Sequence, residues 1–256
     1  MALTQKAKDT YKILAGSDPI PSPTDPELLE ILQNEIFGEV FSTQGLTIKE
    51  REILTVVTLS CLQTLNQLRS HTNFALNVGN EPIVIREAVY QCAPYIGWPR
   101  TLSAMAVINK VFEARGIALP LENAGTVAYE DREAAGAAIQ VPRYGDEVKA
   151  VFAKLPGEYG TFVPHLLTAV GFGDFQTRGI LSDADKELID LIALVAIGAA
   201  TQIKPHINGA VLAGNSLEKI TAAIVQILPY VGFPTALSAL IQVANYNPEA
   251  SQEAYR

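Results

Sequence analysis

The chain contains one segment twice, and this repeat limits what it can fold into more than any other feature. A shift of 135 residues aligns positions 46–105 with 181–240 without a gap, and 19 of the 60 aligned pairs are identical. Self-similarity over this length indicates two copies of one structural unit. We therefore predict a tandem duplication, with residues 1–119 as the first unit and residues 120–256, a linker included, as the second.

The residues that survive the duplication fall into two groups. Glycines and prolines are retained in pairs such as Gly97 and Gly232, which has a backbone explanation because these residues fix chain geometry. Charged and polar residues retained at one shared spacing need a further reason. They are the candidate functional residues: Glu52, Gln67 and His71 in the first unit, and Glu187, Gln202 and His206 in the second.

The pattern of apolar residues predicts helices throughout. Thr47 and Ser182 begin capping motifs, and each is followed by an almost wholly apolar segment, 51–63 and 186–198, typical of a buried helix. After a short break, a second helix is predicted over 67–78 and 202–213, and Gly79 and Gly214 end it. Asn80 and Asn215 are predicted to cap the helix that follows. No segment alternates as a strand does, so the fold class is all-α.

The spacing of the retained polar residues predicts a contact. Gln67 and His71 share one helix face because they are four residues apart. If the two helices are antiparallel across the break, Glu52 and His71 come within side-chain reach of each other. The same holds for Glu187 and His206. We expect a Glu–His pair with Gln alongside, twice in the chain.

Composition excludes several classes of partner. The net charge of −8 argues against nucleic acid and against a basic membrane-binding face. The N-terminal residues lack the apolar stretch of a signal peptide, and the longest apolar run, 191–200, is too short to cross a membrane. Cys61 and Cys92 lie in apolar runs and are expected to be reduced core thiols of a cytoplasmic protein. Residues after Asn247 read as a polar tail.

Together, the motifs resemble those of a known family. Leu-(Thr/Ser)-x-x-x-(Arg/Lys)-Glu is followed by Gln-(Leu/Ile)-(Arg/Lys)-x-His, Ala-x-x-x-Gly and Tyr-x-Gly-(Phe/Trp)-Pro, and each is present twice. This combination resembles the carboxymuconolactone decarboxylase family, over about 28–115 and 162–245. The resemblance implies the all-helical AhpD-like fold with a central antiparallel helix hairpin. It also implies assembly into a ring, for a two-unit chain a homotrimer that forms a pseudo-hexamer.

The peroxidase branch of that family, AhpD, carries Cys-x-x-Cys before the histidine. Here those positions hold Thr64 and Gln67 in one unit, and Ala199 and Gln202 in the other. A disulfide-cycling peroxidase needs an attacking and a resolving thiol. We therefore treat an AhpD-type peroxidase as the least favoured alternative.

The decarboxylase branch implies a carboxy-lyase acting on a small anionic or lactone substrate, without a metal or cofactor. His71 and His206 are candidate proton donors, and Glu52 and Glu187 are expected to orient them and raise their pKa values. The candidate substrate-binding residues are Gln67, Gln202, Arg69, Lys204, Tyr95 and Tyr230.

A second function class stays open from the sequence alone. A Glu–Gln–His cluster between buried helices can be a structural polar network, and the chain can be a non-catalytic scaffold that builds a ring-forming oligomer. The mean hydropathy of +0.18 is high for a monomer, which favours self-association in either case.

Overall fold

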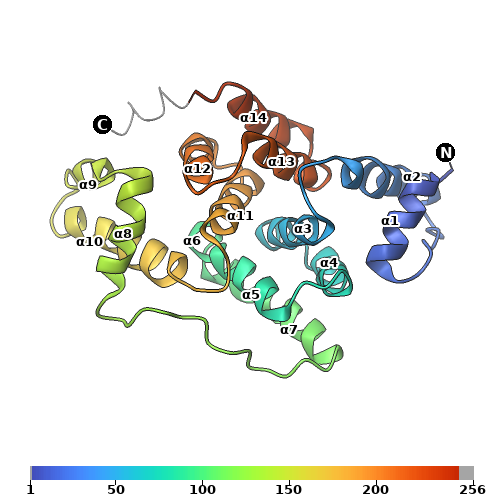
Figure 1. The fold of residues 1–256 in the computed structure, drawn as a ribbon, viewed down its shortest axis with the longest axis horizontal. Coiled ribbons are helices and arrows are strands. Elements are labelled where there is room, and N and C mark those ends of the chain that lie inside the picture. The colour runs from blue at the N-terminus through green and yellow to red at the C-terminus, as the bar shows by residue number, and fades with distance from the viewer. Residues whose placement is uncertain (1, 248–256) are drawn as a thin grey trace.

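The computed structural model describes residues 2–247, and within that range the chain forms helices and no strand (Figure 1). The prediction of an all-α fold is confirmed, while the polar tail predicted after Asn247 lies outside the described residues. The elements in chain order are α1 (Gln5–Ala15), α2 (Pro26–Gln33), the π-helix η1 (Asn34–Glu39), the 3-10 helix η2 (Val40–Ser42), α3 (Ile48–Leu62), α4 (Leu65–Asn77), α5 (Pro82–Gln91), α6 (Ala93–Ile96), α7 (Trp98–Ala114), α8 (Arg132–Tyr144), α9 (Glu147–Phe152), α10 (Tyr159–Leu166), the π-helix η3 (Leu167–Gln176), α11 (Asp183–Ala196), α12 (Ala200–Leu212), α13 (Leu217–Val231) and α14 (Phe233–Ala244).

The two predicted units are present as two matching series of helices. The helix pair α3–α4 corresponds to α11–α12, and α7 corresponds to α14. In both units the apolar helix is buried along nearly its whole length, since eleven residues of α3 and eleven of α11 are buried. The two halves differ in the third helix, because α5 and α6 are separate whereas α13 is continuous through Pro229.

Local sequence explains where the central helices begin and end. Thr47 and Glu50 form a complete capping box at the start of α3, and Ser182 Oγ accepts from the Asp185 amide at the start of α11. Gln63 takes the left-handed conformation, with φ of 59°, at the end of α3. This residue turns the chain so that α4 packs back along α3.

The predicted caps at Asn80 and Asn215 are wrong. The Asn80 side chain donates to the Lys49 carbonyl, and that of Asn215 donates to the Ala184 carbonyl. Both therefore tie the end of the helix pair to the start of the central helix. Ser216, one residue later, caps α13.

A single hydrophobic core runs through both units. It contains side chains of α3 and α11, which pack against each other at the centre of the molecule (Figure 1). Polar contacts also cross between the units. Arg51 Nη1 donates to Gln226 Oε1 at 2.8 Å. Gln91, which is the repeat equivalent of Gln226, donates from its Nε2 to the Phe175 carbonyl at 2.9 Å. The predicted boundary at residue 119 falls in the stretch without helix between α7 and α8.

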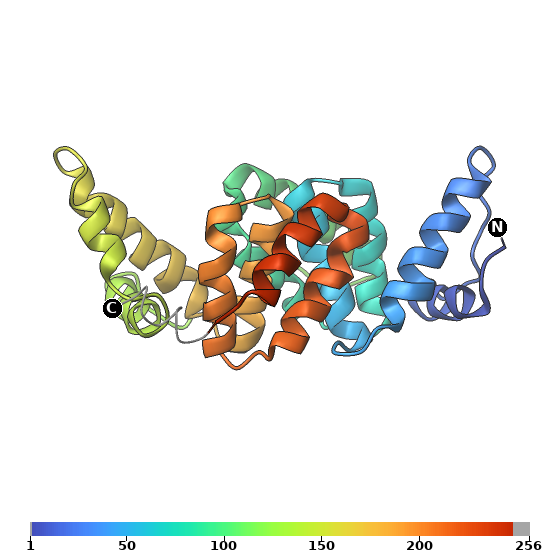
Figure 2. The ribbon, with the colours of Figure 1, turned by 90° about the horizontal axis from the view of Figure 1, so that it is seen from above.

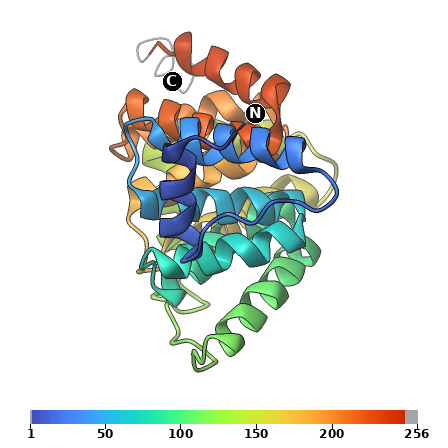
Figure 3. The ribbon, with the colours of Figure 1, turned by 90° about the vertical axis from the view of Figure 1, so that its right-hand side faces the viewer.

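Two arms project from this central block. Helices α1 and α2 with η1 form one end, and α8 to α10 with η3 form the other (Figure 2). Seen from the end formed by α1 and α2, α7 and α14 lie on opposite sides of the central helices (Figure 3). No helix within residues 2–247 is long and apolar enough to cross a membrane.

The second arm depends on two glycines where α8 crosses η3. A Cβ atom at Gly173 would overlap the Arg132 carbonyl oxygen, and one at Gly136 would overlap the Thr168 carbonyl oxygen. Both obstacles are backbone atoms, which cannot rotate away. The two glycines therefore fix the distance between α8 and η3, and with it the position of the residues that α8 brings to the centre.

Replacing Gly173 with Ala should separate α8 from η3 and destabilise the protein by about 1–3 kcal/mol, the usual cost of overpacking. Gly171→Ala is the matched control on the same helix, because its Cβ would meet only the Leu167 side chain, at 3.7 Å. Thermal unfolding followed by circular dichroism should show a clear drop in Tm for the first variant alone. Equal Tm values for both variants would contradict this account of the arm.

Candidate functional site

The first unit brings its predicted pair into direct contact. Glu52 on α3 and His71 on α4 are buried, and His71 Nδ1 lies 2.9 Å from Glu52 Oε2. The antiparallel arrangement inferred from the spacing is therefore confirmed. The imidazole is enclosed by the rings of Phe74 and Tyr230, with centroid distances of 5.2 and 5.6 Å.

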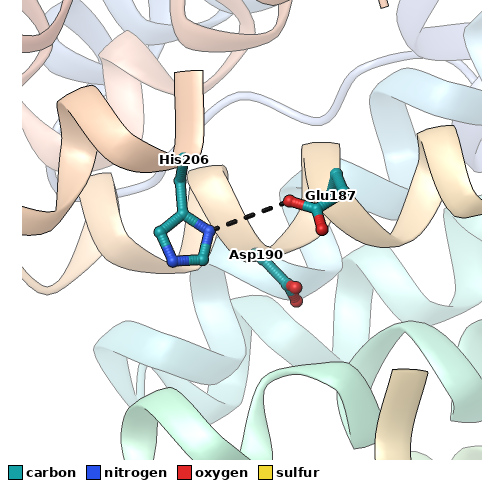
Figure 4. Close-up of side chains that lie close together, drawn as sticks. All are labelled: Glu187, Asp190 and His206. Atoms are coloured by element: carbon teal, nitrogen blue, oxygen red, sulfur yellow. Dashed lines mark ion pairs between the residues drawn. The ribbon is translucent and has the colours of Figure 1, made fainter. Parts of the chain in front are cut away.

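The second unit places the same two residue types further apart. His206 Nδ1 lies 3.9 Å from Glu187 Oε2, and Asp190 lies beside them on α11 (Figure 4). The hydroxyl of Tyr144, at the end of α8, lies between the pair: it donates to Glu187 Oε2 and is 3.1 Å from His206 Nδ1. Arg143 Nη1 donates to Glu187 Oε1 at 3.1 Å. Glu187 is thus already paired with groups other than the histidine.

The prediction that Glu187 raises the pKa of His206 is wrong. Burial lowers the pKa of His206 to about 4. A carboxylate in contact could oppose this effect, but Tyr144 and Arg143 hold Glu187 instead. His206 is therefore neutral at pH 7 and is not the acid in its resting state.

The hydrogen bonds also fix which ring nitrogen carries the proton. Because the Tyr144 hydroxyl gives its hydrogen to Glu187, its oxygen can only accept from His206, so Nδ1 of the neutral ring is the donor. The other nitrogen, Nε2, is then an acceptor, and Figure 4 shows it turned away from Glu187. The result is a chain from Glu187 through Tyr144 to the imidazole.

The two predicted tyrosines cross between the units. Tyr95, on α6 of the first unit, packs edge-on against His206 at 5.6 Å, and Tyr230, on α13 of the second unit, packs in the same way against His71. Each histidine therefore has a carboxylate from its own unit and a tyrosine from the other. A repeat alignment pairs Tyr95 with Tyr230 but gives no hint of this exchange.

A cavity opens at the second pair. It has a volume of about 380 Å³ and is called here the His206 cavity; its lining includes Tyr95, Tyr144, Gln202 and His206. A difference between the units at one position explains much of why the second unit has this cavity and the first does not. Phe74 covers His71 in the first unit, whereas Gly209 stands at the equivalent place in the second, where a Cβ would overlap the Tyr144 hydroxyl. The missing side chain makes room for Tyr144.

Of the other predicted binding residues, only Gln202 lines the His206 cavity. Both Gln202 and its repeat partner Gln67, on α4, are exposed, but Gln67 does not line that cavity. Arg69 and Lys204 are also exposed and do not line that cavity. The positive charge nearest to the pair is instead Arg143.

Asp190 adds a second buried acid to this unit. Gln176 Nε2 donates to its Oδ2, while Oδ1 has no hydrogen-bond partner among the described residues. Burial and then the neighbouring Glu187 raise the pKa of Asp190 well above its usual value. The first unit has Thr55 at this position, so the acid belongs to the second site alone.

Glu187, Asp190 and His206 are also residue types that bind metals, and their ligand atoms lie within 4.8 Å of one another. An ion there would have to share Glu187 with Arg143 and displace the Tyr144 hydroxyl. The present contacts already satisfy Glu187. The arrangement therefore suits proton handling better than metal binding.

The two cysteines are close in space although distant in sequence. Both are free and buried, and contact with Cys61 raises the pKa of Cys92 well above its usual value, as does burial. A thiol in this state is a poor nucleophile. The interior position agrees with the prediction of core thiols.

Sequence reasoning missed Tyr144, Arg143 and Asp190. A signal existed for Asp190, because it is a lone acid in an apolar segment and its repeat partner is a threonine. Tyr144 and Arg143 precede the aligned region, so the repeat could not draw attention to them. Only the crossing of α8 over η3 brings them to Glu187.

Comparison with known proteins also divides the chain into two similar regions. A model of the Carboxymuconolactone decarboxylase family matches residues 26–110 and 163–245. The 4-carboxymuconolactone decarboxylase of Acinetobacter baylyi is 33% identical over 82 residues, which are 32% of this chain and 61% of that protein. Nitrosuccinic acid decarboxylase npaB of Metarhizium robertsii is 35% identical over 81 residues, 32% of this chain and 57% of that protein. The chain thus spans less than two thirds of each relative.

We expect His206 to stay neutral from about pH 8 to about pH 5, because its pKa is lowered to about 4 from an ordinary value near 6.5. The chain has 3 histidines, so proton NMR of the ring signals is simple to interpret, and loss of one signal in His206→Gln assigns it. The His206 signal should not shift over that pH range. A titration midpoint above about 6 would show that Glu187 controls the imidazole after all.

Proposed function

This chain belongs to the carboxymuconolactone decarboxylase family, and on that premise we propose that it removes CO2 from a small carboxylic acid in the His206 cavity. The observation that carries the proposal is a cavity of about 380 Å³ whose lining includes a neutral histidine, two tyrosines and three glutamines, Gln202 among them. Its size suits a small organic acid. Both named relatives are decarboxylases, which supports the reaction class.

Decarboxylation makes two demands on a protein. When the bond to the carboxylate breaks, CO2 leaves and its electron pair stays on the substrate, where a neighbouring carbonyl or nitro group must take it up. Hydrogen-bond donors aimed at that group stabilise the developing negative charge. A proton must then be delivered to the carbanion.

Tyr144 is the proposed proton donor in place of His206. Tyr144 lines the cavity, and burial together with the Glu187 charge raises the pKa of its hydroxyl well above the usual value, so it holds its proton until a strong base forms. Glu187 and His206 position it from two sides. A carbanion is a strong enough base to take this proton, and Tyr144 then regains one from solvent by way of the cavity.

Gln202 and Tyr95 are the proposed binding groups. The Gln202 amide can donate to a carbonyl or carboxylate oxygen, and the Tyr95 ring forms a wall of the cavity against His206. Arg143 pairs with both Glu187 and Asp183, so it offsets part of the negative charge beside the cavity. Arg69 and Lys204, which are exposed, have no part in this scheme.

The first unit is proposed to be structural. Glu52 and His71 contact each other directly, and Phe74 and Tyr230 cover the imidazole where the second unit has a cavity. The pair then acts as a buried polar link between α3 and α4. One working site in each chain follows from this difference.

Tyr144→Phe should lower the rate of CO2 release by about 10²–10⁴-fold, the usual effect of losing a proton-transfer group. His206→Gln should lower the rate by a smaller factor, because His206 positions the Tyr144 hydroxyl and does not transfer the proton. The assay measures CO2 from 4-carboxymuconolactone, nitrosuccinic acid and related small acids. His71→Gln is the matched control, because it makes the same change at the equivalent position of the first unit, and its rate should change little.

If His71→Gln were inactive and His206→Gln active, the reaction would take place in the first unit, which would contradict the proposal. Retention of activity in both Tyr144→Phe and His206→Gln would remove the proposed proton path. If the wild-type protein released no CO2 from any of these acids, the decarboxylase proposal would fall.

The second candidate function is a non-catalytic, ring-forming scaffold, and the two arms favour it. On α2, Leu28 and Ile31 are 66% and 52% exposed, and on α10, Tyr159 and Phe162 are 55% and 50% exposed. These apolar faces lie at opposite ends of the molecule (Figure 2). Contacts between the opposite ends of successive copies close into a ring when the rotation allows it. We propose a homotrimer, which is compatible with catalysis as well.

Light scattering should give about three times the monomer mass of 27.6 kDa. Ile31→Glu and Phe162→Glu should lower that mass, because a charge would be buried at the proposed contact. Leu237→Glu, on α14 between the two ends, is the control and should leave it unchanged. A monomeric wild-type protein at micromolar concentration would rule out both the ring and the scaffold.

A further inference from the structure

A second and larger cavity lies apart from the His206 site. It has a volume of about 930 Å³ and is called here the Arg86 cavity; its lining includes Arg86, Tyr90, Trp98, Phe175 and Arg178. The end of η3 separates the two cavities, because Phe175 faces this one and the next residue, Gln176, faces the other. The proposed decarboxylation uses none of these residues.

Two arginines in this cavity share one acid. Arg86 Nε donates to Glu87 Oε1 at 2.9 Å, and Arg178 Nη2 donates to the same oxygen at 3.1 Å. Both guanidinium groups also lie over the ring of Tyr90, at 5.4 and 5.3 Å from its centroid. Since Glu87 is buried and cancels only one of the two charges, the group keeps one unit of positive charge.

The acid Asp174 also lines the cavity but does not cancel that charge. Its carboxylate pairs with Arg132 Nη1 at 3.0 Å, outside the group of Arg86, Glu87 and Arg178. The net charge facing the cavity therefore remains positive.

Arg86 has hydrogen-bonding capacity left over. The residue is only 8% exposed, yet its Nη2 has no acceptor in hydrogen-bonding geometry, although Glu87 Oε1 is 2.8 Å away. A buried guanidinium nitrogen without an acceptor is costly unless a ligand or water supplies one. The nitrogen itself is buried beside Glu87, but its residue lines the cavity, so a small movement of the Arg86 side chain would let it pair with an acceptor bound there.

The rest of the lining suits a flat apolar body. Trp98 and Phe175 pack with a centroid distance of 5.9 Å, and Leu102 and Met105 extend the apolar wall. Asn109 adds an amide that can bind a polar substituent. Arginine forks are matched in geometry to carboxylates.

We propose that the Arg86 cavity is a binding site for an organic carboxylate with an aromatic or alicyclic ring. The carboxylate binds to Arg86 and Arg178, and the ring packs against Trp98 and Phe175. The site is separate from the His206 cavity, so its occupancy does not depend on the proposed reaction.

The duplication supplies an internal contrast. At the positions equivalent to Arg86, Tyr90 and Asn109, the second unit has Thr221, Val225 and Ala244, and the first unit has Thr43 at the position equivalent to Arg178. The polar groups of the Arg86 cavity therefore occur once in the chain. A feature required only for the shared fold would be expected in both halves.

Trp98 makes the proposal directly testable, because it is the only tryptophan in the chain and lines the cavity. Titration of the purified full-length protein with benzoate should quench its fluorescence to a plateau. Benzamide has the same ring without the charge and should have at least a tenfold weaker effect. Arg86→Gln and Arg178→Gln should each weaken benzoate binding by about ten- to a hundredfold, the usual effect of losing a charged hydrogen bond.

Arg100→Gln is the matched control, because it removes the same charge two residues from Trp98 on α7 but does not line the cavity. Its benzoate affinity should equal that of the wild type. Arg86→Gln and Arg178→Gln each leave Glu87 with one arginine partner. Thermal unfolding shows whether each variant is still folded. Equal quenching by benzoate and benzamide, unchanged benzoate affinity in both arginine variants, or no quenching of the wild-type protein by benzoate would overturn the proposal.

Discussion

The structure depends on the packing of two helices that are buried on every side. Helices α3 and α11 bury almost all of their residues, so each must be covered around its whole circumference. One unit alone does not cover its own central helix, so helices of each unit pack against the central helix of the other. Gln91 and Gln226, at equivalent positions of the repeat, make polar contacts between the two units. The exchange of Tyr95 and Tyr230 between the two histidines follows from the same shared core.

The two Glu–His pairs show how far surroundings determine chemistry. In the first unit the pair is in contact and covered by Phe74; in the second, Tyr144 lies between the partners and Arg143 neutralises the acid. Identical residue types at identical spacing thus give a closed polar link in one half and an open site with a neutral imidazole in the other. The decisive difference is the presence or absence of a side chain at one position, Phe74 against Gly209.

Sequence reasoning recovered what depends on local patterns. The capping motif at Thr47 placed the start of α3, and helical geometry was enough to predict the Glu52–His71 contact. It failed for contacts that are determined by packing between residues far apart in the sequence. Asn80 could bind either the next helix or the previous one, and the sequence does not favour Lys49 over a cap. Tyr144 reaches Glu187 only because glycines let α8 cross η3 closely, and no periodicity encodes such a crossing.

The linker between the halves has a consequence beyond connection. Two identical subunits that exchanged helices in this way would carry every substitution twice, so opening one site would open both. Joined in one chain by the segment between α7 and α8, the halves stay together at high effective concentration and can differ in sequence. The covalent tether thus breaks the symmetry that an assembly of identical copies enforces: one half can keep a sealed, stabilising interior while the other gives up stability for an open pocket.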